Sequence, residues 1–302
     1  YGFEHPARYW ADRGILTYAY DQRGFGRTPY RGLWPGDDRL VADLRTAAAL
    51  ISARHPGVPF YLLGESMGGA VVLAAAVSDS PPRADGLILV APAVWGREAQ
   101  GPLQTLALWI GAHVVPWLTL TGEGLDIVPT DNIEILRQMA YDPLVIKETR
   151  IDAIYGLVDI MDRAWEAAPR LDGLPVLLLY GAREQVIPED AVLAWLRRLP
   201  DADRGERRIA IYPSGYHMLL RDLSAEVVLA DVADWIAGRR DALASGADRI
   251  AESLIASGAD DFAPARAAAL AGMVPAAVDA PSETVAAEGT AAAIAGGHTD
   301  DD

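Results

Sequence analysis

The sequence contains no cysteine, and its only lysine is Lys147. Without cysteine the chain cannot form disulfides, thiolate metal sites or a cysteine nucleophile. This composition fits a reducing compartment, so we expect a cytoplasmic protein, although a signal peptide upstream of Tyr1 is also compatible with it. The 42 acidic and 26 basic residues give a net charge of -16. This charge argues against a nucleic-acid partner, because phosphates attract clustered cations.

Long apolar runs are also missing. A membrane-spanning helix needs about 18 consecutive apolar residues, and the best candidate, residues 106–120, is interrupted by His113 and Pro116. Of the 302 residues, 51% are nevertheless apolar, which is enough for one large core with or without an insertion. We therefore expect a globular protein with no membrane span.

Short apolar runs alternate with helical patterns along most of the chain. The runs predict strands at residues 15–21, 60–64, 86–92, 176–182 and 208–213. They are continuous instead of alternating, which is typical of strands that are covered on both faces. Amphipathic patterns predict helices at residues 37–56, 188–200 and 223–238. The alternation predicts an α/β fold with a mostly parallel, doubly wound sheet.

Two segments break this alternation. Residues 94–170 are helix-like, carry four of the eight tryptophans and separate two core strands, so we interpret them as an inserted helical cap. The alternative is a run of extra core helices. Residues 241–302 are alanine-rich and acidic, and we expect a disordered tail there. The predicted organisation is therefore a core of residues 1–93 and 171–240, with the cap between its two parts and the tail after it.

The stretch "GESMG" at residues 64–68 places Ser66 between a predicted strand and a small-residue helix. In this context G-x-S-x-G indicates a sharp turn that exposes a nucleophilic hydroxyl, and we expect neither Gly64 nor Gly68 to tolerate a side chain. The N–H of Met67, at the start of the helix, would then stabilise an oxyanion. The alternative is an ordinary tight turn.

A serine nucleophile needs a base and an acid later in the chain. Of the five histidines, only His217 follows the last predicted core strand within the expected core, in a loop where a base belongs. Glu184 follows the preceding strand and is our candidate for the acid that orients it. The carboxylates that compete with Glu184 are Glu189, Asp190, Asp159 and Asp162.

These motifs resemble the α/β-hydrolase superfamily, in particular the monoacylglycerol lipase and lysophospholipase-like branch that is also labelled serine aminopeptidase S33 or hydrolase 4. "YAYDQRGFGRT" is similar to its D-x-R-G-x-G-x-S segment, with Thr28 in place of serine. "GESMGGA", "YGAREQVIP" and "GYHMLL" are similar to its nucleophile, acid and histidine segments, with Glu184 where aspartate is usual. The resemblance covers residues 9–238. The upstream strand and oxyanion loop of the family have no counterpart, so we expect an N-terminally truncated form that lacks its first strands and the second oxyanion donor.

The resemblance implies a serine ester hydrolase that needs no cofactor and no metal and acts on a monoacylglycerol, a lysophospholipid or a similar ester. The catalytic residues would be Ser66, His217 and Glu184, and the apolar cap could contact a membrane peripherally. One alternative is amide or peptide cleavage, for which Glu123, Asp126 or Asp131 could anchor a substrate amine. Another is a binding protein that kept the fold and lost the activity. The sequence leaves the oligomeric state open.

Overall fold

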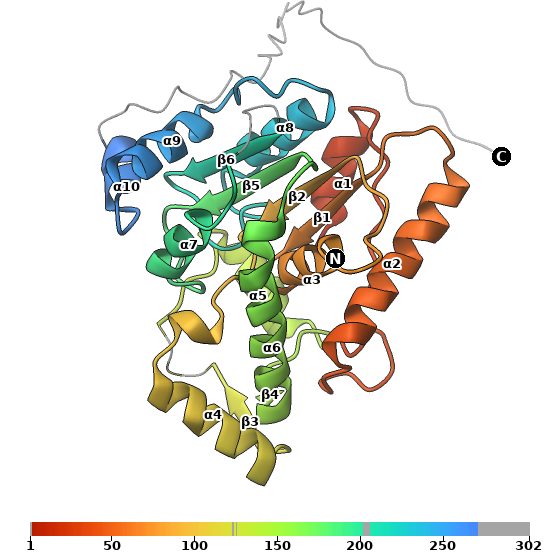
Figure 1. Cartoon of the computed structure of the whole chain (residues 1–302), viewed down its shortest axis with the longest axis vertical. Helices are drawn as coiled ribbons and strands as arrows, with labels where there is room; N and C mark the ends of the chain where they lie inside the picture. The colour runs from red at the N-terminus through yellow and green to blue at the C-terminus, as the bar shows by residue number, and fades with distance from the viewer. Residues whose placement is uncertain (1, 123, 125, 202–205, 271–302) are drawn as a thin grey trace, which may run out of the picture.

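A parallel sheet of four strands forms the centre of the computed structural model, which describes residues 2–122, 124, 126–201 and 206–270. Its strand order is β1 (Tyr61–Glu65), β2 (Gly86–Val90), β5 (Val176–Gly181) and β6 (Arg207–Tyr212) (Figure 1). All three pairings are parallel, with Leu62 opposite Leu87, Leu87 opposite Val176 and Leu177 opposite Arg208. The prediction of a mostly parallel α/β sheet is confirmed.

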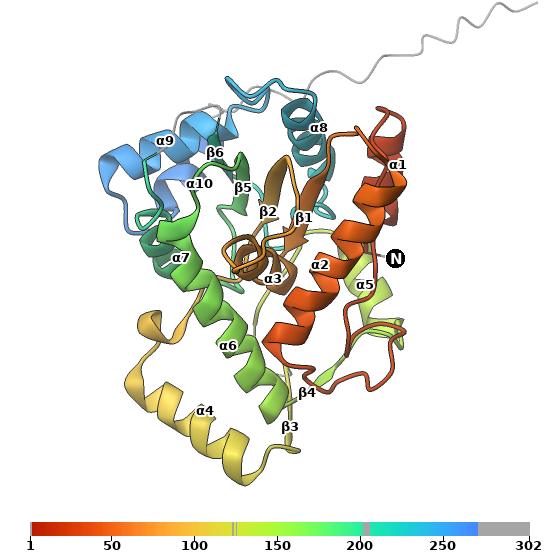
Figure 2. The ribbon, with the colours of Figure 1, turned by 45° about the vertical axis from the view of Figure 1, so that its right-hand side comes forward.

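Helices cover both faces of this sheet. One core contains Leu87, Leu89 and Leu178 together with residues of α2 (Asp37–Arg54), α3 (Met67–Ala76), α6 (Ile151–Ala167) and α7 (Glu189–Leu196). The other contains Ile88 and Leu177 with residues of α1 (Glu4–Ala11) and α8 (Ala225–Ile236). Adjacent strand residues thus point into different cores, as pleated strands require. The predictions of α2, α7 and α8 are confirmed (Figure 2).

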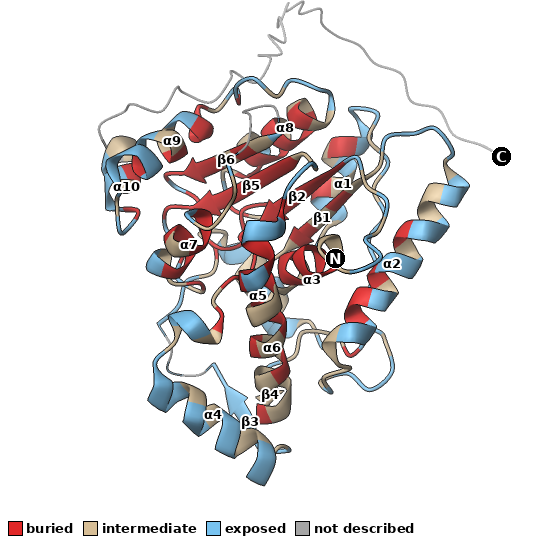
Figure 3. Cartoon of the chain, in the orientation of Figure 1, coloured by how far each residue is buried: buried red, intermediate tan, exposed pale blue. Residues whose placement is uncertain are grey.

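The segment between β2 and β5 contains both helices and a small sheet. It comprises α4 (Pro102–Val114), α5 (Ile133–Tyr141) and α6, together with an antiparallel pair of β3 (Thr119–Thr121) and β4 (Glu148–Arg150). It also holds two 3₁₀ turns, η1 (Arg97–Ala99) and η2 (Ala168–Arg170). The helix α6 packs on α3 and contributes to the core, whereas α4 has no buried residue (Figure 3). Part of this segment is therefore core helix and part projects from the core.

The predicted strand at residues 15–21 is wrong. These residues form no strand, and most of their side chains from Leu16 to Asp21 are exposed. A strand is stabilised by a hydrogen-bonded neighbour, and in the described part of the chain β1 pairs with β2 alone. The apolar composition of this segment was therefore not enough to make it a strand.

The prediction of a disordered tail from residue 241 is also wrong for residues 241–270. This stretch forms α9 (Ala247–Ser257) and α10 (Ala263–Leu270), and it buries Leu243, Leu254 and Phe262. The helix α9 packs along β6, which is an edge strand of the sheet. Covering an edge strand protects its unpaired backbone groups. Residues 271–302 of the predicted tail lie outside the described residues.

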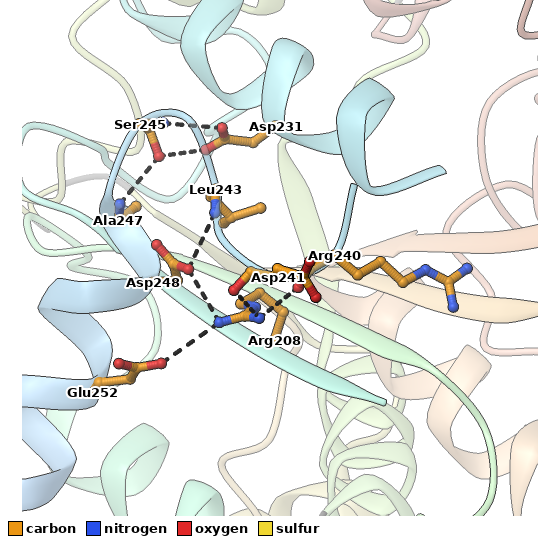
Figure 4. A network of polar contacts seen from close by, with 9 residues as sticks. All are labelled: Arg208, Asp231, Arg240, Asp241, Leu243, Ser245, Ala247, Asp248 and Glu252. Carbon is orange, nitrogen blue, oxygen red and sulfur yellow. Dashed lines mark hydrogen bonds and ion pairs between the residues drawn. The ribbon is translucent and has the colours of Figure 1, made fainter. Parts of the chain in front are cut away.

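A buried ion pair ties α9 to β6 (Figure 4). Arg208 of β6 and Asp248 of α9 approach to 3.1 Å, and both side chains are only 2% exposed. Glu252 lies 3.5 Å from the same guanidinium, which also donates to the carbonyl oxygens of Arg240 and Asp241. The Asp248 carboxylate accepts the Leu243 N–H as well. Acceptors from the 240–252 segment therefore surround both terminal nitrogens of the buried arginine, whereas its Nε and Asp248 Oδ1 have no hydrogen-bond partner among the described residues.

We expect Asp248→Ala to lower the free energy of unfolding by about 3 kcal/mol, because removing one partner of a buried pair leaves the other charge poorly compensated. This value is the low end of the range of about 3–5 kcal/mol expected for breaking a buried ion pair, because Glu252 still faces Arg208. Urea denaturation of both proteins measures the difference. Asp260→Ala is the matched control: Asp260 pairs with Arg197 at the surface, where such pairs contribute at most about 1 kcal/mol. Equal losses in the two variants would contradict a stabilising role of the buried pair.

None of the helices in the described part of the chain combines the length and apolar character that crossing a bilayer requires.

Candidate active site

Ser66 occupies the turn between β1 and α3. Its backbone has φ 52° and ψ -121°, a conformation that residues other than glycine rarely adopt. The turn is held by hydrogen bonds from the Ser66 N–H to Val90 O and from the Ala93 N–H to Ser66 O. Strain of this kind costs about 1–3 kcal/mol and persists where the surroundings enforce it. The turn places the Ser66 hydroxyl within 3.0 Å of His217 Nε2.

The two glycines of the motif differ in importance. A Cβ on Gly64 would lie 2.5 Å from Gly68 O and 2.7 Å from Gly69 Cα, so this position requires glycine. A Cβ on Gly68 would meet only the Gln22 side chain, at 3.6 Å, which is ordinary contact. The expectation that Gly68 excludes a side chain on steric grounds is therefore wrong. Gly69 takes the second role instead, because a Cβ there would lie 2.7 Å from Pro92.

The structure brings Ser66, His217 and Glu184 into one hydrogen-bonded row. The Nε2 of His217 lies 3.0 Å from Ser66 Oγ, and its Nδ1 lies 2.7 Å from Glu184 Oε2. The three residues come from the loops after β1, β6 and β5, whose carboxyl ends share one edge of the sheet. The row can move a proton from a hydroxyl to an imidazole that a carboxylate orients.

Glu184 is well fixed in this row. Its side chain is fully buried, and Oε1 accepts the N–H groups of Val186 and Ile187 at 2.6 and 3.2 Å. The other oxygen is thereby directed at the imidazole. Nearby, burial and secondarily the Glu184 charge raise the pKa of Tyr180, so this phenol stays neutral and donates to Pro92 O.

Met67 is the first residue of α3. The first N–H groups of a helix have no acceptor within it and carry the positive end of its dipole. The Met67 N–H directly follows Ser66 in the chain. It is thus placed to donate to an oxyanion that forms on a carbonyl oxygen when Ser66 Oγ attacks the carbonyl carbon.

The competing carboxylates lie in other interactions. Glu189 pairs with Arg266 and accepts the Phe262 N–H. Asp159 and Asp162 both pair with Arg97. Asp190 accepts the Ala191 N–H. Of the histidines other than His217, His5 lies in α1, His55 directly after α2 and His113 in α4. His298 lies outside the described residues.

Asp21 of the "DQRGFGRT" segment stabilises a turn. Its carboxylate accepts the Arg27 N–H at 2.9 Å, and it lies so close to Gly26 that a Cβ there would meet it at 2.3 Å. Arg23 reaches away from this turn and forms a two-point ion pair with Asp43 of α2. No group of three or more potential metal-ligating side chains lies together among the residues that the structure describes.

Sequence reasoning missed a buried polar layer behind the row. The Glu65 carboxylate, next to Ser66, pairs with Arg221 of the His217 loop. Asp222 is 4% exposed and accepts the Tyr216 N–H at 2.7 Å. Burial raises the pKa of Asp222, and contacts with the Thr130 hydroxyl and the Tyr216 amide partly oppose this rise. An acidic residue inside the serine motif was the only sequence signal for this layer.

The sheet, the turn at Ser66 and the residue row define an α/β-hydrolase. The profile of the family described as serine aminopeptidase, S33, matches residues 2–224, and the chain belongs to this family. Monoacylglycerol lipase of Mycolicibacterium smegmatis is 28% identical over 78% of this chain and 82% of its own length. Mouse monoglyceride lipase is 29% identical over 77% and 76%. The chain is an ester hydrolase of the α/β fold.

Solved structures agree on the fold. The crystal structure of Paleococcus ferrophilus monoacylglycerol lipase superposes with a TM-score of 0.63 at 22% identity, over 78% of this chain and 88% of the other. At this identity the likeness shows the fold alone. The predicted resemblance to the α/β-hydrolase superfamily and its lipase-like branch is confirmed.

Proposed function

We propose that the protein hydrolyses carboxylic esters through an acyl-enzyme formed on Ser66. The observation that supports this most directly is the row of contacts from Ser66 Oγ through His217 to Glu184, at 3.0 and 2.7 Å. These distances lie within the hydrogen-bonding range that a nucleophile and its base need. The strained turn at Ser66 is the second support, because strain of this kind concentrates at functional positions.

In the first half of the reaction His217 Nε2 takes the hydroxyl proton while Ser66 Oγ attacks the ester carbonyl carbon. The carbonyl oxygen becomes an oxyanion, which the Met67 N–H stabilises. Collapse of the intermediate breaks the bond to the alcohol, and His217 returns the proton to the leaving alkoxide. In the second half His217 removes a proton from water while the water oxygen attacks the acyl carbon. Collapse of this intermediate breaks the bond to Ser66 Oγ, His217 returns the proton to Oγ, and the carboxylic acid leaves. Glu184 stabilises the imidazolium in both halves.

The substrate that we propose is a monoacylglycerol, a lysophospholipid or another ester with an apolar acyl chain. Two sequence relatives carry the names monoacylglycerol lipase and monoglyceride lipase. The segment between β2 and β5 also offers apolar surface, including Leu103, Trp109 and Trp117, which are 79, 49 and 63% exposed. Apolar surface of this kind is suited to an acyl chain.

We further propose that residues 94–170 act as a cap whose α4 and β3 rest peripherally on a lipid surface. Large exposed apolar patches commonly mark contact sites, and the exposed apolar residues of this part are Leu103, Leu106, Trp109, Ile110, Val114, Trp117, Leu118 and Leu120. Because the chain is strongly acidic, the surface would be zwitterionic and not anionic.

Amide or peptide cleavage is less well supported. An aminopeptidase needs a free carboxylate near the site to hold the substrate amine. Asp131 already accepts the Leu223 N–H at 2.8 Å. Asp126 is exposed, and Glu123 lies outside the described residues. A binding protein without activity is disfavoured by the intact contacts between Ser66, His217 and Glu184.

A comparison of substrates tests the proposal. We expect p-nitrophenyl acyl esters and monoacylglycerols to be turned over, with higher kcat/KM for longer acyl chains, and aminoacyl anilides to react far more slowly. A monoacylglycerol presented in zwitterionic vesicles tests the surface contact, because Trp117→Ser should slow its turnover and leave a soluble short-chain ester unaffected. Faster turnover of the anilides would overturn the ester assignment.

A further inference from the structure

Five consecutive residues of the segment between β2 and β5 contact the loops that carry the acid and the base. We call residues 128–132, "VPTDN", the strap. The strap precedes α5 and lies far from both loops in the sequence. It was not singled out by any motif.

The first contact reaches the acid loop. The Val128 N–H donates to the side-chain oxygen of Gln185 at 2.9 Å, and Gln185 directly follows Glu184 in the chain. The second contact reaches the base loop. Pro129 O accepts the N–H of Met218 at 2.9 Å, and Met218 directly follows His217. The strap therefore bonds to the neighbour of each of these two residues.

The next three residues hold the far side of the base loop. Thr130 is fully buried and contacts the carboxylate of Asp222. Asp131 Oδ1 accepts the Leu223 N–H at 2.8 Å. The side-chain N–H of Asn132 donates to Arg221 O at 3.0 Å. Two successive strap residues, Asp131 and Asn132, thus hydrogen-bond to Leu223 and Arg221.

Asp222 and Arg221 also contact residues that directly precede His217 and Ser66 in the chain. Asp222 accepts the Tyr216 N–H at 2.7 Å, on the residue before His217. Arg221 pairs with Glu65, on the residue before Ser66. The strap, Asp222 and Arg221 therefore form one connected network around Ser66, His217 and Glu184. Three atoms of this network, Glu65 Oε1, Arg221 Nε and Asp222 Oδ1, are buried without a hydrogen-bond partner among the described residues, so its constraint on geometry comes from the bonds named above.

We propose that Asp131 and Asn132 of the strap are positioning residues that hold the His217 loop against Ser66 and Glu184. The inference rests on the proposed function, since it assigns a role within the same site. Neither residue touches the reacting atoms. Their effect passes through Leu223 and Arg221 to the imidazole, and a displacement of the base by about 1 Å can cost about 10²-fold in rate.

Asn132→Asp is the decisive variant because Asn132 has two separable roles. Its Oδ1 caps α5 by accepting the N–H groups of Glu134 and Ile135, and aspartate serves equally well in that position. Its Nδ2, however, is the donor to Arg221 O, and an aspartate oxygen there would face a carbonyl oxygen. The variant keeps the helix cap and loses the strap bond.

Asp131 offers a second, matched pair of variants. Asp131→Asn keeps an oxygen that can accept the Leu223 N–H, whereas Asp131→Ala removes it. We expect Asn132→Asp and Asp131→Ala to lower the rate of Ser66 labelling by a fluorophosphonate about 10- to 100-fold. We expect Asp131→Asn to stay close to the wild type. With a soluble short-chain ester, kcat should fall and KM should change little.

A proton NMR readout separates this inference from the proposed function. The proton between His217 Nδ1 and Glu184 gives a downfield resonance whether or not the protein hydrolyses esters, and it should broaden or vanish in Asn132→Asp and Asp131→Ala. A wild type that shows the resonance but is neither labelled nor active would refute the proposed function alone. Folded Asn132→Asp and Asp131→Ala proteins that keep the resonance and the labelling rate would refute the strap. The role of the strap would also be refuted if the labelling of each variant fell only by the fraction of its protein that is unfolded.

Discussion

Replacing Ser66 by alanine should lower kcat/KM for ester hydrolysis by about 10⁶-fold, the order of loss found when a serine nucleophile is removed. The hydroxyl lies 3.0 Å from His217 Nε2, and no alanine atom can replace its attack or its proton transfer. What remains is substrate binding and the Met67 N–H, which act without a covalent step. Initial rates on a p-nitrophenyl ester measure the loss, and fluorophosphonate labelling should disappear with it.

Stability should not change in this variant. Alanine is held in the same positive-φ turn as Ser66, so the backbone strain of the native turn remains. Ser78→Ala is the matched control. The Ser78 hydroxyl donates to Ala75 O just after α3, outside the row of Ser66, His217 and Glu184. A Ser66→Ala protein that retained turnover within about tenfold of the Ser78→Ala protein would refute the acyl-enzyme.

The parts of this protein that the sequence predicts are those with a local cause. The strands β1, β2, β5 and β6 are continuous apolar runs that end at turn residues, and each was predicted within a few residues. Ser66, His217 and Glu184 could be predicted to meet because each follows such a strand, and the carboxyl ends of parallel strands share an edge. The structure brings these three together; their roles in catalysis remain our proposal.

The parts that were not predicted depend on contacts between distant residues. Large apolar residues such as Leu254 and Phe262 are few in this alanine-rich segment, so the sequence predicted no core there. In the structure β6 and α7 provide the surfaces on which this segment packs, and α9 and α10 form. Residues 15–21 show the opposite error. They are rich in apolar residues, but no strand in the described part of the chain pairs with them, so they form no strand. Asn132 and Arg221 carry no motif, and their hydrogen bond joins residues that are 89 positions apart. No local pattern encodes such a pairing.

Glu184→Gln should lower kcat/KM by about 10³- to 10⁴-fold, the effect expected when the orienting acid of a serine–histidine pair becomes an amide. The glutamine oxygen can still accept the N–H groups of Val186 and Ile187. Its NH₂ group then faces His217 Nδ1 and donates to it. That tautomer carries its proton on Nε2, toward Ser66, and cannot accept the hydroxyl proton.

Glu184→Asp tests whether the length of this side chain matters. The carboxylate would retract by one methylene, so it could not keep both the two backbone N–H groups and the contact of 2.7 Å to His217. We expect a loss of about 10- to 100-fold, smaller than for Glu184→Gln because the charge is kept. Glu189→Gln is the control, since Glu189 pairs with Arg266 outside the row. If Glu184→Gln and Glu189→Gln lowered kcat/KM equally, the carboxylate that orients His217 would have to lie elsewhere.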